Sequence, residues 1–159
     1  RKEVFDLLPS NIDHLIPIGR LDLNTEGLLL FTNNGDFSRY MEHPKNKIIR
    51  KYKIKVRGRV KKEKIDEITG EMIINNIKYN IINAELMSYS QSNSWLTIEI
   101  AEGKNREVRK IFEHLDIQIN RLIRIKFGPF ELGQIKKGEF IELKKKEVQL
   151  KLKKIGFKE

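Results

Sequence analysis

The sequence has no cysteine among its 159 residues, and it has only four prolines and one tryptophan. Without cysteine there is neither a disulfide framework nor a thiolate metal site. The three histidines, His14, His43 and His114, show no metal-ligand spacing. A phosphate-binding loop and a glycine-rich nucleotide motif are also missing. We therefore expect neither a metal nor an organic cofactor.

Long apolar runs are missing as well, so no segment has the length needed to cross a membrane. The N-terminus does not resemble a signal peptide and does not begin with methionine, which is typical of a fragment or a processed form. A chain of this length can bury a core without disulfides or metals. We expect a monomeric cytoplasmic protein, with residues 1–159 forming one domain.

Charge is abundant and unbalanced, with 32 Lys and Arg against 22 Asp and Glu, a formal net charge of +10. A folded domain this basic usually binds a polyanion, with nucleic acid as the first candidate. An anionic membrane surface is the second candidate, but it rests only on the basic segment 144–154, whose apolar face is thin. Part of the lysine excess is also explained by the general abundance of Ile, Lys and Asn, which AT-rich genomes encode.

The apolar pattern predicts strands and helices in no regular alternation. Strands are expected at Leu15–Ile18, Leu28–Thr32, Lys51–Arg57, Ile77–Met87, Trp95–Ala101, Ile119–Phe127 and Phe140–Leu143. Helices are expected at Val4–Leu8, from a cap at Asp36 to before Pro44, and at Lys62–Ile68, Asn105–Leu115 and Val148–Ile155. This mixture predicts an α+β fold with a mixed, mostly antiparallel sheet flanked by helices.

The most informative segment is a polar loop, residues 19–27, that lies between two glycines and directly before a continuous apolar run. It carries a carboxylate, Asp22, two residues after Arg20. Catalytic groups commonly lie on loops held by a rigid scaffold. Taken alone, however, an aspartate in a loop is more often a turn residue with a nearby arginine as its ion-pair partner.

The wider context favours the catalytic interpretation. The fifteen residues Gly19–Asn33 resemble the signature of the pseudouridine synthase family typified by RsuA, whose members modify ribosomal RNA. Residues 51–56 resemble the second motif of this family and residues 102–110 its third, and residues 121–128 also look familial. The resemblance spans about residues 4–143. The motif formed by residues 105–109 is similar to that of the RluB-like enzymes, the large-subunit branch of the family.

This resemblance implies a pseudouridine synthase fold and an isomerisation of uridine to its C-glycoside. The base must detach from the ribose, rotate and reattach through carbon five, and Asp22 is the implied catalytic carboxylate. It attacks the base, or attacks the anomeric carbon, or takes a proton from the ribose; the sequence leaves these three open. The implied partner is ribosomal RNA, 23S in preference to 16S. The reaction is redox-neutral and implies no cofactor.

Two further residues match catalytic positions of the family. Tyr52 matches the aromatic residue that stacks on the flipped base, and its hydroxyl is a candidate for proton transfer. Arg109 matches the arginine that pairs with the catalytic aspartate, where a guanidinium favours the ionised carboxylate. Without the resemblance, Tyr52 would be interpreted as a core residue of a strand and Arg109 as a solvated charge on a helix.

Several basic or polar residues are candidates for RNA contact. They are Arg20, Arg50, Lys51, Lys104, Asn105, Arg106 and Arg124. Arg20 is the candidate for opening the RNA or holding the phosphate beside the flipped nucleotide. Residues 104–106 lie at the N-terminus of a predicted helix, and the start of a helix favours phosphate. For each of these residues taken singly, a solvated basic face is the alternative.

The sequence departs from the family pattern in two ways. An N-terminal S4-type RNA-binding domain and a first strand are missing, which affects substrate affinity more than chemistry. Glu107 stands where many relatives have glutamine. The competing hypothesis is a non-catalytic RNA-binding module or ribosome assembly factor. The joint presence of Asp22, Tyr52 and Arg109 favours the enzyme, because a protein that only binds RNA has no need of a carboxylate in a positive groove.

Overall fold

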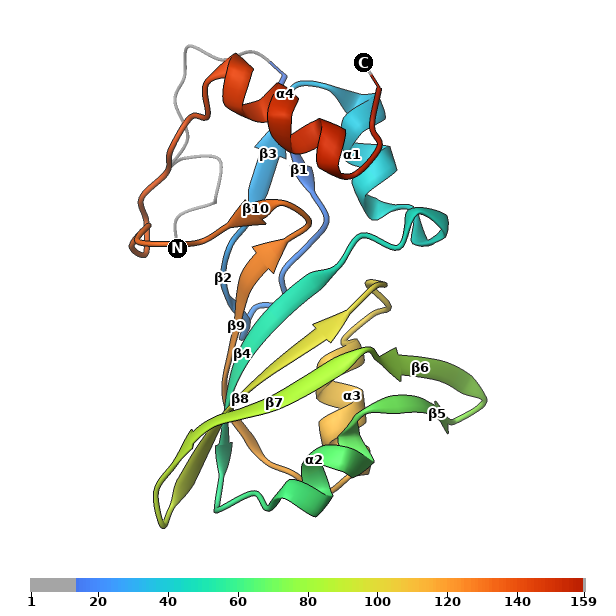
Figure 1. Ribbon diagram of the computed structural model, residues 1–159, viewed down its shortest axis with the longest axis vertical. Helices are drawn as coiled ribbons and strands as arrows, with labels where there is room; N and C mark the ends of the chain where they lie inside the picture. Colours follow the sequence, from blue (N-terminus) through green and yellow to red (C-terminus); the bar gives the residue numbers. More distant parts are fainter. Residues whose placement is uncertain (1–13, 159) are drawn as a thin grey trace.

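Two long strands, β4 (Arg50–Arg57) and β9 (Ile119–Phe127), form the axis of the molecule and pair antiparallel along their length (Figure 1). The structure is a computed structural model, and it describes residues 14–158. The helix expected at residues 4–8 lies outside the described residues. β4 and β9 run along the long axis and connect an upper and a lower body.

The main sheet has the order β10-β9-β4-β8-β7, with β2 added along β9. The further strands of this sheet are β2 (Glu26–Gly27), β7 (Asn83–Tyr89), β8 (Asn93–Ile100) and β10 (Phe130–Glu131). All neighbouring pairs are antiparallel except β2 and β9, which run parallel. The predicted α+β class with a mixed, mostly antiparallel sheet is therefore confirmed.

The lower body is a sheet covered by helices. In Figure 1, α2 (Lys62–Ile68) and α3 (Glu107–His114) lie behind the lower half of the sheet. Alternate residues of β4, Ile54 and Val56, point into this layer and are fully buried, as are Ile111 and Phe112 of α3. We call this cluster the lower core; its fully buried members are Ile54, Val56, Ile68, Tyr79, Ile81, Leu96, Ile98, Ile100, Ile111 and Phe112.

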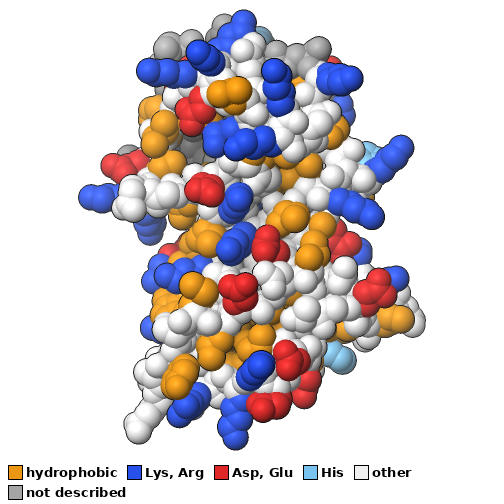
Figure 2. All heavy atoms as spheres, viewed as in Figure 1, with side chains coloured by type: hydrophobic (Ala, Val, Ile, Leu, Met, Phe, Trp, Pro, Cys, Tyr) orange, Lys and Arg blue, Asp and Glu red, His pale blue; other side chains and the backbone are white. Residues whose placement is uncertain are grey.

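The upper body is assembled from short pieces of chain. It contains β1 (Ile16–Ile18), β3 (Leu30–Thr32), α1 (Gly35–Glu42), a 3-10 turn at Pro44–Asn46 and α4 (Lys145–Lys154). Buried side chains of β1, α1 and α4 form the upper core together with residues of β9, β10 and the connecting segments. It consists of Ile18, Leu28, Phe37, Met41, Ile48, Phe127, Phe130 and Leu152. Lys and Arg side chains gather over α4 at the top of the face shown in Figure 2. None of the helices within residues 14–158 is long and apolar enough to cross a bilayer.

The start of α1 differs from the prediction. The expected cap was Asp36, but Asn34 caps the helix, because its side chain accepts hydrogen bonds from the backbone N–H groups of Asp36 and Phe37 at 3.0 and 3.1 Å. The strand expected at residues 28–32 is also shorter: β3 begins at Leu30 and is only half-buried on both faces. Among the described residues, β3 pairs with β1 in a separate two-stranded sheet.

One hairpin was missed. The strand expected at residues 77–87 divides into β6 (Ile77–Ile81) and β7, which belong to different sheets. β6 pairs with β5 (Gly70–Ile74), a strand that was not predicted. The two are joined at Asn75 and Asn76, both with positive φ. Asparagine is among the residues that tolerate this conformation in tight hairpins, so this pair was a usable signal.

The remaining differences lie near the helices and the C-terminus. α3 begins at Glu107 rather than at residue 105, and α4 begins at Lys145 rather than at residue 148. The strand expected at residues 140–143 is wrong, since this segment has no regular structure. Phe140 and Ile141 are more than half exposed there, so their apolar character does not come from core packing.

Candidate active site

The loop that carries Asp22, residues 19–27, is attached to β9 at its C-terminal end. Gly27 runs alongside Arg124 in the parallel β2–β9 pair, and the backbone N–H of Leu28 donates to the Arg124 carbonyl at 2.8 Å. Gly27 has φ +108, and a Cβ there would lie 2.2 Å from the Arg124 carbonyl oxygen. Only glycine fits this approach, because any side chain would collide with backbone that cannot give way.

The side chain of Arg124 strengthens the same attachment. It is buried, and its Nε and Nη2 donate to the carbonyl oxygen of Leu28 at 2.9 and 2.8 Å. Its guanidinium lies 4.8 Å from the ring centre of Phe127. Burial lowers the pKa of Arg124, while the neighbouring Tyr52 opposes this shift. Arg124 was predicted to contact RNA, but its hydrogen bonds hold the end of the Asp22 loop.

Asp22 itself begins a tight turn. The backbone N–H of Thr25 donates to the Asp22 carbonyl at 2.9 Å, which leaves Leu23 at the tip with 71% of its surface exposed. On the far side of the turn, Glu26 accepts two hydrogen bonds from Arg121, at 2.8 and 3.0 Å. The loop is therefore held at both ends of its C-terminal half, and the Asp22 carboxylate projects from a defined backbone.

The cation beside Asp22 is Arg106, not the predicted Arg109. Nη1 of Arg106 lies 3.5 Å from Oδ2 of Asp22. Arg106 stands just before α3 with φ +50, and this left-handed conformation places it outside the regular helix. Arg109, one turn further, donates instead to the carbonyl of Asn24 at 2.7 Å. Both arginines therefore contact the Asp22 loop, one at the carboxylate and one at the backbone.

Arg109 also interacts electrostatically with Asp22. Burial and the like charge of Arg106 lower the pKa of Arg109, and the carboxylate of Asp22 opposes them. The Nε atom of Arg109 is buried and has no hydrogen-bond partner. Arg109 thus remains in the electrostatic environment of Asp22 although it does not form the direct ion pair.

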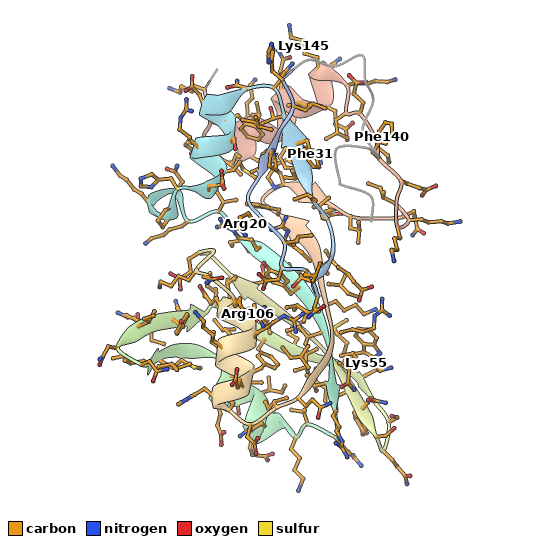
Figure 3. The ribbon with its side chains drawn as sticks, turned by 180° about the vertical axis from the view of Figure 1, so that it is seen from behind. Arg20, Phe31, Lys55, Arg106, Phe140 and Lys145 are labelled. Atoms are coloured by element: carbon orange, nitrogen blue, oxygen red, sulfur yellow. The ribbon has the colours of Figure 1, made fainter. Side chains whose placement is uncertain are left out.

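A cavity of about 440 Å³ opens beside Asp22 at the junction of the two bodies. Nine of the ten predicted site residues line it: Arg20, Asp22, Arg50, Tyr52, Lys104, Asn105, Arg106, Arg109 and Arg124. Figure 3 places Arg20 and Arg106 on either side of the waist between the bodies. The tenth residue, Lys51, does not line the cavity. Because side chains alternate along β4, Lys51 points to the opposite face of the sheet from Tyr52.

Tyr52 forms part of the wall of the cavity. It is half-buried on β4 and stands opposite Arg124 in the β4–β9 pair. Burial raises the pKa of its hydroxyl, while the charges of Arg124 and Arg50 oppose that shift. The hydroxyl is therefore neutral at pH 7, and the ring is available as an aromatic surface for a base.

Arg50 is more deeply placed than the sequence suggested. It is buried, and it donates to the carbonyls of Ile48 and Met41 at 2.6 and 3.4 Å. Its guanidinium lies 4.6 Å from the ring centre of Phe127, on which Arg124 also stacks. Burial lowers its pKa. Two guanidinium groups are thus held in the wall of the cavity by carbonyls and a shared ring.

The charge of the cavity favours anions. Its cationic side chains are Arg20, Arg50, Lys104, Arg106, Arg109 and Arg124, and its carboxylates are Asp22, Glu42 and Glu107. Glu42 and Phe127 were not predicted as part of the wall, because only the folded arrangement brings them to it. Such a surface attracts phosphate, and it contains one carboxylate, Asp22, on an accessible loop.

A second hollow, of about 510 Å³, lies on the other side of Arg106 and Arg109. It is lined by the C-terminal half of α3 and the start of β9, including Glu113 and Asp116, and it contains neither Asp22 nor Tyr52. We therefore assign the chemistry to the first cavity. Within residues 14–158, no three histidine or carboxylate side chains are grouped so that they could hold a metal ion.

Solved structures share this fold. A protein described as pseudouridylate synthase superposes with a TM-score of 0.78 at 23% identity, over 92% of this chain and 64% of that one. A chain from an H/ACA RNP bound to a substrate RNA containing 2'-deoxyuridine superposes with a TM-score of 0.61 at 17% identity, over 76% of this chain and 41% of that one. The architecture is therefore the pseudouridine synthase fold.

Sequence comparison defines the family. Residues 4–114 match the family described as RNA pseudouridylate synthase. An uncharacterized RNA pseudouridine synthase of Rickettsia bellii is 42% identical over 146 residues, which cover 92% of this chain and 63% of the relative. Ribosomal large subunit pseudouridine synthase B of Buchnera aphidicola is 41% identical over 157 residues, which cover 93% of this chain and 61% of the relative. The chain belongs to the RNA pseudouridylate synthase family, and it spans less than two thirds of the length of these two relatives.

Proposed function

We propose that this protein converts specific uridines of ribosomal RNA to pseudouridine, with Asp22 as the catalytic carboxylate. The observation that carries the proposal is the position of Asp22, on a clamped turn 3.5 Å from Arg106 and at the wall of a cationic cavity. A protein that only binds RNA gains nothing from a carboxylate there, because it repels phosphate. A catalyst needs a group of this kind, ionised and well oriented.

The chemistry is an isomerisation in which no atom is gained or lost. The bond between N1 of the base and the ribose breaks, the base rotates, and carbon five forms the new bond to the ribose. Carbon five then loses its proton and N1 gains one, so the step needs no oxidant or reductant. Asp22 initiates this sequence at the base, at the anomeric carbon or at a ribose proton.

The other residues of the cavity have roles that fit this chemistry. The ring of Tyr52 offers a stacking surface to a base that has left its helical neighbours, and its neutral hydroxyl is a candidate for proton transfer. Arg106 contacts the carboxylate of Asp22 and orients it, and Arg109 holds the turn through the Asn24 carbonyl. A cavity of about 440 Å³ lies within the range of about 300–1,000 Å³ typical of small-ligand sites.

Binding of the RNA is assigned to the cations around the cavity. Arg20, Lys104 and Arg106 are exposed and available to phosphates, and Arg20 is the candidate for opening the RNA. Arg50 and Arg124 contribute charge from within the wall rather than direct contacts. Lys51 lies on the opposite face of the sheet from the cavity, so it contacts the RNA only if the RNA chain wraps around the domain.

The proposed substrate is the 23S RNA of the large ribosomal subunit. Support comes from the Buchnera relative, which is named for the large subunit and is 41% identical to this chain. We further propose that residues 1–159 act as one monomeric catalytic domain in the cytoplasm. Because the relatives are longer, the missing length is proposed to include an RNA-binding domain of the S4 type that contributes affinity and site selection.

The test is the release of tritium from ribosomal RNA labelled at carbon five of uridine. The wild-type chain and Asp36→Asn, which removes an exposed carboxylate outside the cavity, should release tritium. Asp22→Asn should release none, because an amide neither attacks nor takes a proton, yet it should bind RNA with unchanged or higher affinity. Loss of turnover by at least about 10²-fold is expected.

If the wild-type chain releases no tritium, the same assay is repeated with a longer protein that includes the N-terminal RNA-binding domain. Release by the longer protein and not by its Asp22→Asn form would support the proposal. If the longer protein also binds RNA without releasing tritium, the protein is a binding module and the proposal is wrong.

A further inference from the structure

Two carboxyl groups meet beneath the cavity at the start of α3. Glu107, the first residue of the helix, is 3% exposed, and Glu102 lies in the preceding segment with its side chain 23% exposed. One oxygen of each is satisfied. Oε1 of Glu107 accepts from the backbone N–H of Lys104 at 3.3 Å, and Oε2 of Glu102 accepts from the Lys104 ammonium at 2.7 Å.

The other oxygen of each carboxyl group has no such donor. Oε2 of Glu107 and Oε1 of Glu102 are both fully enclosed and have no hydrogen-bond partner when both groups are written as carboxylates. Buried polar atoms are rarely left in this state. A single proton between the two carboxyl groups satisfies both oxygens at once, because the protonated group becomes a donor and the ionised group accepts.

The surroundings favour this proton. Burial, the charge of Glu102 and a hydrogen bond with Glu102 together raise the pKa of Glu107 to about 8, although the backbone N–H and the charge of Lys104 oppose them. The titratable or charged groups that face Glu107 are Glu102 and Lys104 from the preceding segment, and Arg50 and Tyr52 from β4. At pH 7 Glu107 therefore keeps its proton and can donate a hydrogen bond to Glu102.

The two carboxyl groups flank Arg106, the residue that contacts Asp22. Glu102 and Glu107 lie on either side of Arg106 in the chain, and contact between their side chains closes a ring across residues 103–106. Arg106 has φ +50, a conformation that residues with a Cβ rarely adopt, and no side chain caps this helix end. Something must hold the backbone there, and the carboxyl pair is the contact that spans it.

We propose that Glu102 and Glu107 form a proton-sharing positioning pair that holds Arg106 in its left-handed conformation and so sets the Arg106–Asp22 contact. This role rests on the proposed function of the Asp22 site. Neither carboxyl group touches the reacting base. Loss of the shared proton leaves two negative carboxylates in contact beneath a phosphate-binding surface. Their repulsion destabilises the backbone of residues 102–107, and the added negative charge repels RNA.

The sign of the pH effect follows from the direction of the shift. Glu107 holds its proton more tightly in the folded state than its ordinary pKa of 4.5 allows. The stability from this proton is therefore complete below about pH 4.5, declines as the pH rises and is fully lost above about pH 8. RNA affinity is expected to fall above pH 8, approaching tenfold per pH unit if only the singly protonated pair positions Arg106.

The decisive comparison uses Glu107→Gln, which keeps the shape and a permanent donor but cannot ionise. RNA binding is measured from pH 6 to pH 9.5 in an Asp22→Asn background, so that turnover does not interfere. We expect Glu107→Ala to bind weakly at all pH values and Glu107→Gln to restore binding without the loss above pH 8. Glu113→Gln, an exposed carboxylate on the same helix, is the matched control and should follow the wild-type profile.

A second measurement needs neither RNA nor activity. Carbon-13 NMR of the glutamate carboxyl groups should show one group that titrates near pH 8, and Glu107→Gln should remove it. Glu102→Gln should lower the titration point of Glu107, because the neighbouring charge is gone. If no glutamate titrates above pH 6, the pair does not share a proton. Parallel RNA-binding profiles of the wild type and Glu107→Gln would also overturn the proposal, whereas a failure of the tritium assay alone would leave it standing.

Discussion

The two bodies of the molecule are built in different ways, and the site depends on both. The lower core is a regular sheet with two helices packed on one face, whereas the upper core gathers single side chains from distant parts of the sequence, from Ile18 to Leu152. The Asp22 loop is attached to the upper core through Ile18 and Leu28, which flank it. Arg109 belongs to α3, whose buried face lies in the lower core, and Arg106 directly precedes this helix.

This division places the two halves of the Asp22–Arg106 contact on separate packing units. Of the strands within residues 14–158, β4 and β9 pass from one body to the other, and β9 also carries Arg124, which holds the end of the loop. The distance between carboxylate and guanidinium is therefore set by how rigidly these two strands connect the bodies. The geometry of the site is a property of the whole domain, not of the loop alone.

The largest expected effect comes from cavities in the two cores. Met41→Ala in the upper core and Ile111→Ala in the lower core each remove a fully buried side chain, and each should lower the free energy of unfolding by about 2–5 kcal/mol. Chemical denaturation should be followed by circular dichroism for the whole chain and by the fluorescence of Trp95, the single tryptophan, for the lower body.

If the two cores fold as one unit, both probes will move together in both variants. In Met41→Ala, the circular dichroism transition could shift while the Trp95 fluorescence transition stays unchanged. This result would mean that the upper body unfolds by itself, and the proposed dependence of the site on both bodies would be wrong. Leu150→Ala, at a position 57% exposed on α4, is the control and should change stability by less than about 0.5 kcal/mol.

The attachment of the Asp22 loop can be tested at Gly27. Gly27→Ala combines a positive φ with a Cβ 2.2 Å from the Arg124 carbonyl, so a loss of about 2–4 kcal/mol is expected, together with reduced turnover. Gly58→Ala is the matched control. Gly58 also has a positive φ, +83, but no atom lies within 4 Å of the added Cβ, so only the backbone strain of about 1–2 kcal/mol remains. Equal losses in the two variants, measured by thermal denaturation, would show that the close approach to β9 contributes nothing.

The smallest effect is expected for the exposed ion pair at the edge of the same loop. The hydrogen bond from Arg121 lowers the pKa of Glu26, and burial only partly opposes it. The stabilisation is therefore present above the ordinary pKa of 4.5 and is lost as the pH falls through the lowered value. Glu26→Gln should destabilise by less than about 1 kcal/mol at pH 7 and not at all in strong acid. A pH-independent difference between the variant and the wild type would assign the effect to packing instead of charge.

The difference between the bodies also explains which predictions from the sequence hold. In the lower body, β4, α2 and β9 follow from periodicity, because one sheet face and one helix stripe are continuously buried there. In the upper body, burial is decided by contacts between distant segments, so the extent of β3 and the exposure of Phe140 were wrong. The β5–β6 hairpin was missed although Asn75-Asn76 marked a turn and the apolar alternation changes phase at Ile81-Ile82, where β6 ends.

The same holds for the candidate site. The motif pattern gathered nine residues that do meet at one cavity, because each motif lies at the end of a strand or helix. It did not predict that Arg106 rather than Arg109 stands beside Asp22, since that choice depends on the left-handed backbone at Arg106. It also did not predict the burial of Arg50 and Arg124, because Arg50 was placed just before a strand and Arg124 at a polar position of an alternating strand.

The two buried guanidinium groups around Phe127 have a consequence for how the protein is constrained. Removing a charge from water is costly, and here that cost is met during folding, before any RNA arrives. The cavity therefore has a standing positive potential that does not have to be created on binding. A chain selected only for stability would replace Arg50 and Arg124 with apolar residues, so their presence marks a stability–function trade-off fixed in the interior of the domain.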